Sequence, residues 1–209
     1  MDNKKTPLQI KGINDSLYGG FWLRLGALLL DGIFVMPVVF LALYLNSFGK
    51  NIYFLTFIPN LLFGLWYGIY LPKKYGGTPG KLVVGLKIVR LDGETIGWKE
   101  SIWRYSINLV ITIFSVTMMT VCILKADNSV YTGLSWLKQS LYLTSLAPTF
   151  FTIHTWTNNI WVYGELVVLL TNKRKRAIHD FIARTVIVKS KYIDQIRQTM
   201  QEDEQIGSR

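Results

Sequence analysis

The sequence predicts an all-α polytopic membrane protein with about four transmembrane helices and a small cytoplasmic β-hairpin or strand element. Half of the 209 residues are hydrophobic and only 17% are charged, so the mean hydropathy is positive, at +0.28. Several apolar runs are long enough to cross the roughly 30 Å of hydrocarbon in a bilayer. The basic residues gather in the segments between alternate runs, as they do in polytopic membrane proteins.

The chain begins with a polar stretch, residues 1–20, which we expect to be a cytoplasmic N-terminal segment. The first apolar run, residues 21–44, exceeds the roughly 7–15 residues of a signal-peptide core and lacks a cleavage pattern. It is therefore predicted to be a retained span. Two opposite charges interrupt it: Arg24 can extend toward the headgroups, whereas Asp31 lies about 15 Å deep, near the membrane midplane.

An acid at that depth costs about 2.5–3.5 kcal/mol on insertion scales, so it normally faces a bundle interior, finds a partner or is protonated. Asp31 therefore has two interpretations, which the sequence leaves open. It is either an ion- or proton-binding residue or a structural hydrogen-bonding group between helices.

Two further spans are predicted at residues 52–71 and 105–124, because both runs are free of charged residues. They flank a basic cytoplasmic loop, residues 72–104. The fourth span is predicted at residues 156–171, after an outer segment at 125–155. The alternative is that an apolar stretch of this outer segment, residues 134–153, is the fourth span instead.

The basic residues predict the topology. Three lie in residues 1–20, seven in the loop 72–104 and nine after residue 172, whereas only Lys50, Lys125 and Lys138 lie in the predicted outer segments. This asymmetry favours cytoplasmic termini and an even number of spans in the cell membrane. We expect the clustered charges to meet anionic phospholipids at the cytoplasmic face of the bilayer, so a nucleic-acid partner is not needed to explain the net charge of +10.

The membrane domain is predicted to cover residues 21–191 and to include a small sheet. Asp92-Gly93 separates two runs rich in β-branched residues, which indicates a hairpin. Because two strands alone are marginally stable, we expect Thr185–Lys189 to pair with Leu86–Leu91. Residues 192–209 are predicted to be a cytoplasmic tail whose last residues, 201–209, are disordered.

The residues offer little for catalysis or for a cofactor. Cys122 is the single cysteine, and neither histidine has metal-ligand spacing, so no metal site is predicted. The sequence Gly-Gly-Thr-Pro-Gly-Lys resembles a P-loop, but Tyr75 and Leu82 occupy the positions that need glycine and a hydroxyl residue. We expect it to be a flexible turn with Lys81 near the headgroups. We therefore expect that the protein is not an enzyme and that it binds no cofactor.

Glu165 is a second acid in a predicted span. Two acids, Asp31 and Glu165, facing one cavity would suit the exchange of monovalent cations and protons. Since four spans are few for a transport pathway, we expect a homo-oligomer or a membrane-protein partner. The alternative function is a regulatory membrane protein that binds a partner through its cytoplasmic loop and tail.

Three blocks of the chain resemble the signature blocks of the RDD family of membrane proteins. They read FWLRLGALLLDGIFV, GGTPGKLVVGLKIVRLDG followed by SIWRYSINL, and RAIHDFIARTVIV. The family is named for one arginine and two aspartates, to which Arg24, Asp31 and Asp180 correspond. Further matching positions are Gly80, Lys81, Arg104 and His179.

The resemblance implies a small bacterial inner-membrane protein with cytoplasmic termini. Some members of the family are described as cation/proton antiporters and another as a regulator of a membrane protease. Because Asp180 closely follows the last predicted span, it should lie at the level of Arg24. We expect these two residues to form an ion pair that clamps the first helix to the tail and leaves Asp31 free for function.

Overall fold

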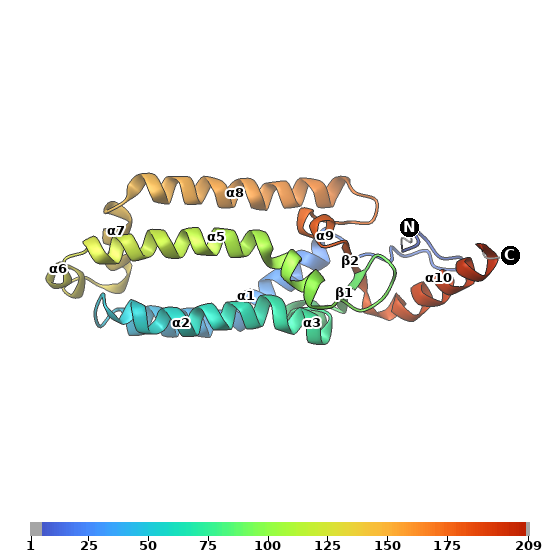
Figure 1. Cartoon of the computed structure of the whole chain (residues 1–209), viewed down its shortest axis with the longest axis horizontal. Coiled ribbons are helices and arrows are strands. Elements are labelled where there is room, and N and C mark those ends of the chain that lie inside the picture. The colour runs from blue at the N-terminus through green and yellow to red at the C-terminus, as the bar shows by residue number, and fades with distance from the viewer. Residues whose placement is uncertain (1–5, 208–209) are drawn as a thin grey trace. The chain divides into compact units, whose positions relative to one another are not determined.

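The computed structural model describes residues 6–207, and it is mostly helical (Figure 1). Three stretches are long and apolar enough to cross a membrane: Phe21–Asn46, Ile52–Val83 and Trp98–Lys125. The predicted fold class is therefore confirmed. The helical elements, in chain order, are α1 (Phe21–Asn46), α2 (Ile52–Leu65), the π-helix η1 (Trp66–Tyr70), α3 (Leu71–Tyr75), α4 (Pro79–Val83), α5 (Trp98–Lys125), α6 (Asn128–Thr132), α7 (Trp136–Ser145), α8 (Pro148–Thr171), α9 (Ile178–Ile182), the 3-10 helix η2 (Ser190–Tyr192) and α10 (Ile193–Gly207).

The long helices present apolar side chains on their outer surfaces. In α1, Leu28, Leu29 and Ile33 are each more than 60% exposed. A helix of a water-soluble protein would instead turn such a face toward a core. At about 1.5 Å per residue, the 26 residues of α1 reach about 39 Å, which exceeds the hydrocarbon thickness. These exposed apolar surfaces are therefore suited to contact with lipid rather than with water.

The predicted outer segment, residues 125–155, is helical for most of its length. It contains α6, α7 and the beginning of α8, which runs unbroken from Pro148 to Thr171 (Figure 1). The predicted fourth span, residues 156–171, is thus the C-terminal part of a longer helix of 24 residues. The competing segment, residues 134–153, is divided between α7 and α8, because the helix is interrupted before Pro148.

The chain divides into two compact units, each with its own core. The sheet unit comprises the described residues up to Phe34, then Tyr67–Tyr105 and Gly164 onward. The helical unit comprises Val35–Trp66 and Ser106–Tyr163. A cluster of buried residues forms the core of the helical unit: Cys122, Ile123, Ala126, Tyr131, Leu143 and Ala147.

The sheet unit contains two antiparallel strands, β1 (Leu86–Arg90) and β2 (Thr185–Lys189). Their register aligns Ile88 with Ile187, which confirms the predicted pairing of the central loop with the C-terminal segment. The predicted hairpin within the loop is only partly formed. After the turn at Asp92-Gly93, a single bridge from Val89 to Thr95 replaces a second hairpin strand, and β2 is the main partner of β1.

The C-terminal tail is ordered as helix α10, and the prediction of disorder for residues 201–209 is wrong as far as Gly207. Residues 208 and 209 lie outside the described part of the chain. Ile196 of α10 is almost fully buried with Tyr18, Val89 and Val186 in the core of the sheet unit. This apolar anchor explains why the charged sequence after it is helical.

The Gly-Thr-Pro-Gly-Lys segment is not the flexible turn that we expected, because it forms the start of α4 and packs on α1. Thr78 is the N-cap and Pro79 the first helical residue, which suits proline because that position needs no intrahelical N–H bond. The next residue, Gly80, touches the backbone of α1. A Cβ atom at Gly80 would lie 2.2 Å from the carbonyl oxygen of Ala27 and 2.7 Å from the amide nitrogen of Asp31.

We predict that Gly80→Ala lowers the free energy of unfolding by about 1–3 kcal/mol, because α4 must move away from α1 to admit a methyl group. The measurement is unfolding in detergent micelles followed by circular dichroism. Gly32→Ala is the matched control, since a Cβ atom there would meet nothing within 4 Å. Equal stability of the two variants would contradict the close approach of α4 and α1.

Candidate functional site

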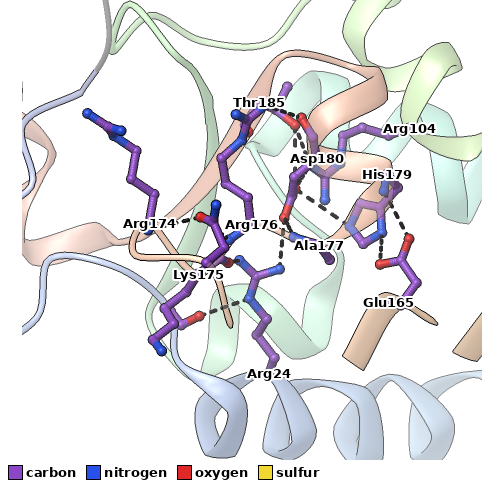
Figure 2. Close-up of polar contacts among 12 residues, drawn as sticks. Arg24, Arg104, Glu165, Arg174, Lys175, Arg176, Ala177, His179, Asp180 and Thr185 are labelled. Atoms are coloured by element: carbon purple, nitrogen blue, oxygen red, sulfur yellow. Dashed lines mark hydrogen bonds and ion pairs between the residues drawn. The ribbon is translucent and has the colours of Figure 1, made fainter. Parts of the chain in front are cut away.

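Two clusters of polar side chains lie within the sheet unit, and each is built around one aspartate. The Asp31 cluster consists of Asp31, Tyr67, Thr78, Gly80 and Lys81. The Asp180 cluster consists of Asp180 and the groups that are linked to it directly or through one further residue, drawn in Figure 2: Arg24, Arg104, Glu165, Lys175, Arg176, Ala177, His179 and Thr185. Together the clusters contain all the positions singled out from the sequence.

In the Asp31 cluster, three donors hold the carboxylate. The Tyr67 hydroxyl donates to Oδ1 at 2.5 Å, the Thr78 hydroxyl to Oδ2 at 2.6 Å, and the backbone N–H of Gly80 to Oδ1 at 2.7 Å. The last bond satisfies an amide in the first turn of α4 that has no intrahelical acceptor. We had expected Asp31 to be free of structural contacts. It instead joins α1 to η1 and to α4.

Lys81 supplies the positive charge nearest to Asp31. Its Nζ lies 3.9 Å from Oδ2 of Asp31, which is longer than a hydrogen bond, and it donates to the Thr78 hydroxyl at 3.1 Å. Lys81 therefore contacts the carboxylate through charge alone. This contact can break while the three shorter hydrogen bonds to Asp31 stay in place.

In the Asp180 cluster, the carboxylate is fully buried and contacts two guanidinium groups (Figure 2). Arg24 of α1 donates to Oδ2 at 3.0 Å, and Arg104 of α5 donates to Oδ1. The backbone N–H of Ala177 also donates to Oδ2, at 2.9 Å, so that Asp180 caps its own short helix α9. The expected ion pair between Arg24 and Asp180 is thus present, with Arg104 as a second partner.

Opposing effects act on the pKa of Asp180. Burial raises it, because an ionised carboxylate loses its hydration. The charges of Arg104, His179 and Arg24 and the Ala177 N–H bond act in the other direction and outweigh burial, so the pKa lies well below its usual range. Asp180 is therefore a permanently ionised structural anchor at neutral pH.

The two arginines are themselves held by further acceptors. Arg24 donates from Nε to the carbonyl oxygen of Gly19 at 2.9 Å and from its other terminal nitrogen to the carbonyl oxygen of Lys175. Arg104 also donates to the hydroxyl of Thr185, the first residue of β2. The cluster thereby positions β2 as well as α9.

Glu165 and His179 form a separate contact at the edge of the Asp180 cluster. Nδ1 of His179 lies 2.6 Å from Oε2 of Glu165, and the backbone N–H of His179 donates to Oε1 at 2.9 Å. Glu165 thereby joins α8 to α9 (Figure 2). The two acids proposed as one ion site, Asp31 and Glu165, have different partners and belong to different clusters.

The sequence did not single out three residues that complete these clusters. Thr78 lay in the recognised turn, but its hydroxyl had no assigned partner, and Tyr67 lay in an uncharged span without any distinguishing pattern. Arg176 was counted among the cytoplasmic charges, yet it is buried and donates to the carbonyl oxygens of Asp180 and Thr185. A basic residue in a Lys/Arg run gives no signal that it points inward.

The described residues contain no group of three or more histidine, cysteine or acidic side chains that could hold a metal ion. The two clusters instead pair acids with arginine, lysine and hydroxyl groups. This arrangement can fix helices, carry a proton or exchange a bound cation.

The fold and the clusters define a multi-pass membrane protein with a small sheet tied to its helices by buried ionic contacts. The profile of the RDD family matches residues 18–184, and the chain belongs to this family. It is similar to the uncharacterized proteins YxaI and YckC of Bacillus subtilis (strain 168). YxaI is 30% identical over 109 residues, which is 41% of this chain and 72% of YxaI. YckC is 40% identical over 78 residues, 37% of this chain and half of YckC. No solved structure matches the chain.

We predict that Asp180→Asn lowers the free energy of unfolding at pH 7 by about 3–5 kcal/mol, because the buried Arg104 and the partly buried Arg24 lose their counter-charge. The pH dependence has a defined sign. Since the pKa of Asp180 is depressed in the folded state, its contribution is present above the unfolded pKa of about 3.9 and is lost as the pH falls below it. Because the asparagine of the variant does not titrate, the stability of the variant should fall less steeply than that of the wild type as the pH is lowered below about 3.9.

The matched control is Asp203→Asn, which removes an exposed carboxylate from α10 and should change stability by less than about 0.5 kcal/mol. Thermal unfolding in detergent micelles from pH 3 to 8 measures both variants. Wild-type stability of Asp180→Asn at pH 7 would contradict the structural role of this cluster.

Proposed function

We propose that this RDD-family membrane protein exchanges protons for a small monovalent cation at Asp31. The observation that supports the proposal is the loose contact between Asp31 and Lys81, at 3.9 Å. A carboxylate within a membrane span needs a compensating positive charge. Lys81 supplies that charge without a direct hydrogen bond, so a proton or a cation can replace it.

The residues around Asp31 are suited to binding either a cation or a proton. The hydroxyl oxygens of Tyr67 and Thr78 lie within hydrogen-bonding distance of the carboxylate, so they add oxygen ligands of the kind that hard cations prefer. When Asp31 is protonated, the same hydroxyls can accept or donate in turn, because each carries both functions. Lys81 then remains bonded to Thr78.

The test is flux in proteoliposomes that contain a pH-sensitive dye. A jump in external sodium, potassium or lithium should drive protons across the membrane through the wild-type protein. We predict that Asp31→Asn reduces this flux to the level of protein-free liposomes, because the amide cannot bind a proton or compensate a cation. Glu94→Gln, at an exposed position outside both clusters, should retain it.

Variants enter the comparison only if they elute as one species and melt within a few degrees of the wild type. Wild-type protein without cation-dependent flux, or Asp31→Asn with unchanged flux, would contradict the proposal.

A second function is favoured by the same hydrogen bonds. Because Gly80, Thr78 and Tyr67 satisfy both carboxylate oxygens, Asp31 has a structural task even without transport. The protein would then be a regulatory membrane protein whose loop and tail bind a partner. Co-purification of one stoichiometric partner, lost with Glu202→Lys and Asp203→Lys on α10 but kept with Asp31→Asn, would support this function.

We further propose that α8 is the fourth span and that both termini are cytoplasmic, in the cell membrane. The 24 residues of α8 reach about 36 Å, enough to cross the hydrocarbon. This topology keeps nineteen of the 23 basic residues on the cytoplasmic side. Since four helices offer little room for a pathway, the transport proposal also implies a homo-oligomer.

A further inference from the structure

A cavity of about 370 Å³ lies in the sheet unit, outside both aspartate clusters. Its walls come from the end of α3, from β1 and from the beginning of α10. The volume falls in the range of about 300–1,000 Å³ that is usual for small-molecule sites. The cavity is lined by one carboxylate, that of Asp194, and by four cationic side chains: Lys73, Lys74, Lys87 and Arg197.

Three of the cations are held in place by contacts that leave hydrogen-bond donors available. Nζ of Lys73 lies 5.1 Å from the centre of the Trp98 ring, and Nζ of Lys74 lies 5.2 Å from that of Tyr75. These contacts involve the charge, so the ammonium N–H groups can bind other acceptors. Within the described part of the chain, Arg197 donates from Nε to the carbonyl oxygen of Gly93 at 3.1 Å, and no hydrogen bond engages its terminal nitrogens.

Like charges gathered in one cavity repel each other unless an anion joins them. A phosphate group fits this lining best, because it carries up to two negative charges and several acceptor oxygens. Thr95 and Ser190 add hydroxyl donors, while Ile88 and Ile193 add apolar surface for an organic substituent. A simple carboxylate ligand would use fewer of these donors.

We propose that this cavity binds a phosphate group, carried either by the headgroup of an anionic phospholipid or by a soluble phosphate ester. The lipid source agrees with the position of α3, which belongs to the Ile52–Val83 stretch that is apolar enough to cross a membrane. The site is independent of Asp31, so its test does not depend on whether the protein transports cations.

The experiment is isothermal titration calorimetry on the full chain in detergent micelles. The ligands are short-chain phosphatidic acid, inorganic phosphate and, as a headgroup without net charge, short-chain phosphatidylcholine. We predict saturable binding of phosphatidic acid that weakens at least about tenfold in the double variant Lys74→Gln/Lys87→Gln, because two charge-assisted contacts are lost. Both lysines are exposed, so the fold should tolerate their replacement.

The matched control is Lys11→Gln/Lys99→Gln, which removes two exposed charges outside the cavity and should change the affinity by less than about twofold. Binding of phosphatidic acid but not of inorganic phosphate would identify a lipid headgroup as the source. Competition by inorganic phosphate would identify a soluble phosphate group. Absence of saturable binding by either ligand, or an equal loss in both double variants, would overturn the proposal.

Discussion

The buried carboxylate of Asp180 is the constraint on which the sheet unit depends. A charge without solvent exposure is tolerated only when partners replace its hydration, and here Arg24 and Arg104 do so from two different helices. Residues that are 156 and 76 positions from Asp180 in the chain must therefore come together before Asp180 can be buried. The hydroxyl of Thr185 also accepts a hydrogen bond from Arg104, so Arg104 determines where β2 begins.

The two aspartates have parallel tasks. Asp31 accepts a bond from the first turn of α4, and Asp180 accepts one in the first turn of α9. Each of these five-residue helices is followed by a residue in the left-handed region, Gly85 or Arg184, and then by one strand of the sheet. One aspartate thus holds the helix that leads into β1, and the other holds the helix that leads into β2. Asp31 differs in its loosely held lysine, and this difference supports a functional task beyond anchoring.

Much of the helical architecture could be predicted from the sequence, because the length of each apolar run can be compared directly with the hydrocarbon thickness of a bilayer. The pairing of β1 with β2 was predictable as well, since an isolated hairpin is marginal and one further strand candidate was present. Disorder of the tail was predicted from its charge, but Ile196 is buried in the core of the sheet unit, and Ile193 and Met200 pack against the same core. The flexible turn at Gly80 was predicted from its glycines, which instead permit the contact with α1.

The partners of Asp31 could not be predicted, because they depend on the local path of the chain. The π-helix turn η1 carries Tyr67, and the N-terminal amide of α4 is available only because Gly80 lies against α1. The pattern of apolar residues in the sequence predicts neither the π-helix turn nor the contact of Gly80 with α1. The Arg24–Asp180 pair was accessible from the sequence because both residues flank spans at the same predicted level, whereas the inward direction of Arg176 was not.

A double-mutant cycle between Arg24→Gln and Asp180→Asn tests the central claim most directly, by unfolding of the single and double variants in detergent micelles at pH 7. If the buried ion pair holds α1 to α9, the double variant loses less stability than the sum of the single variants, with a coupling free energy of at least about 1 kcal/mol. Additivity within about 0.3–0.5 kcal/mol would show that the two residues act independently, and would contradict the claim.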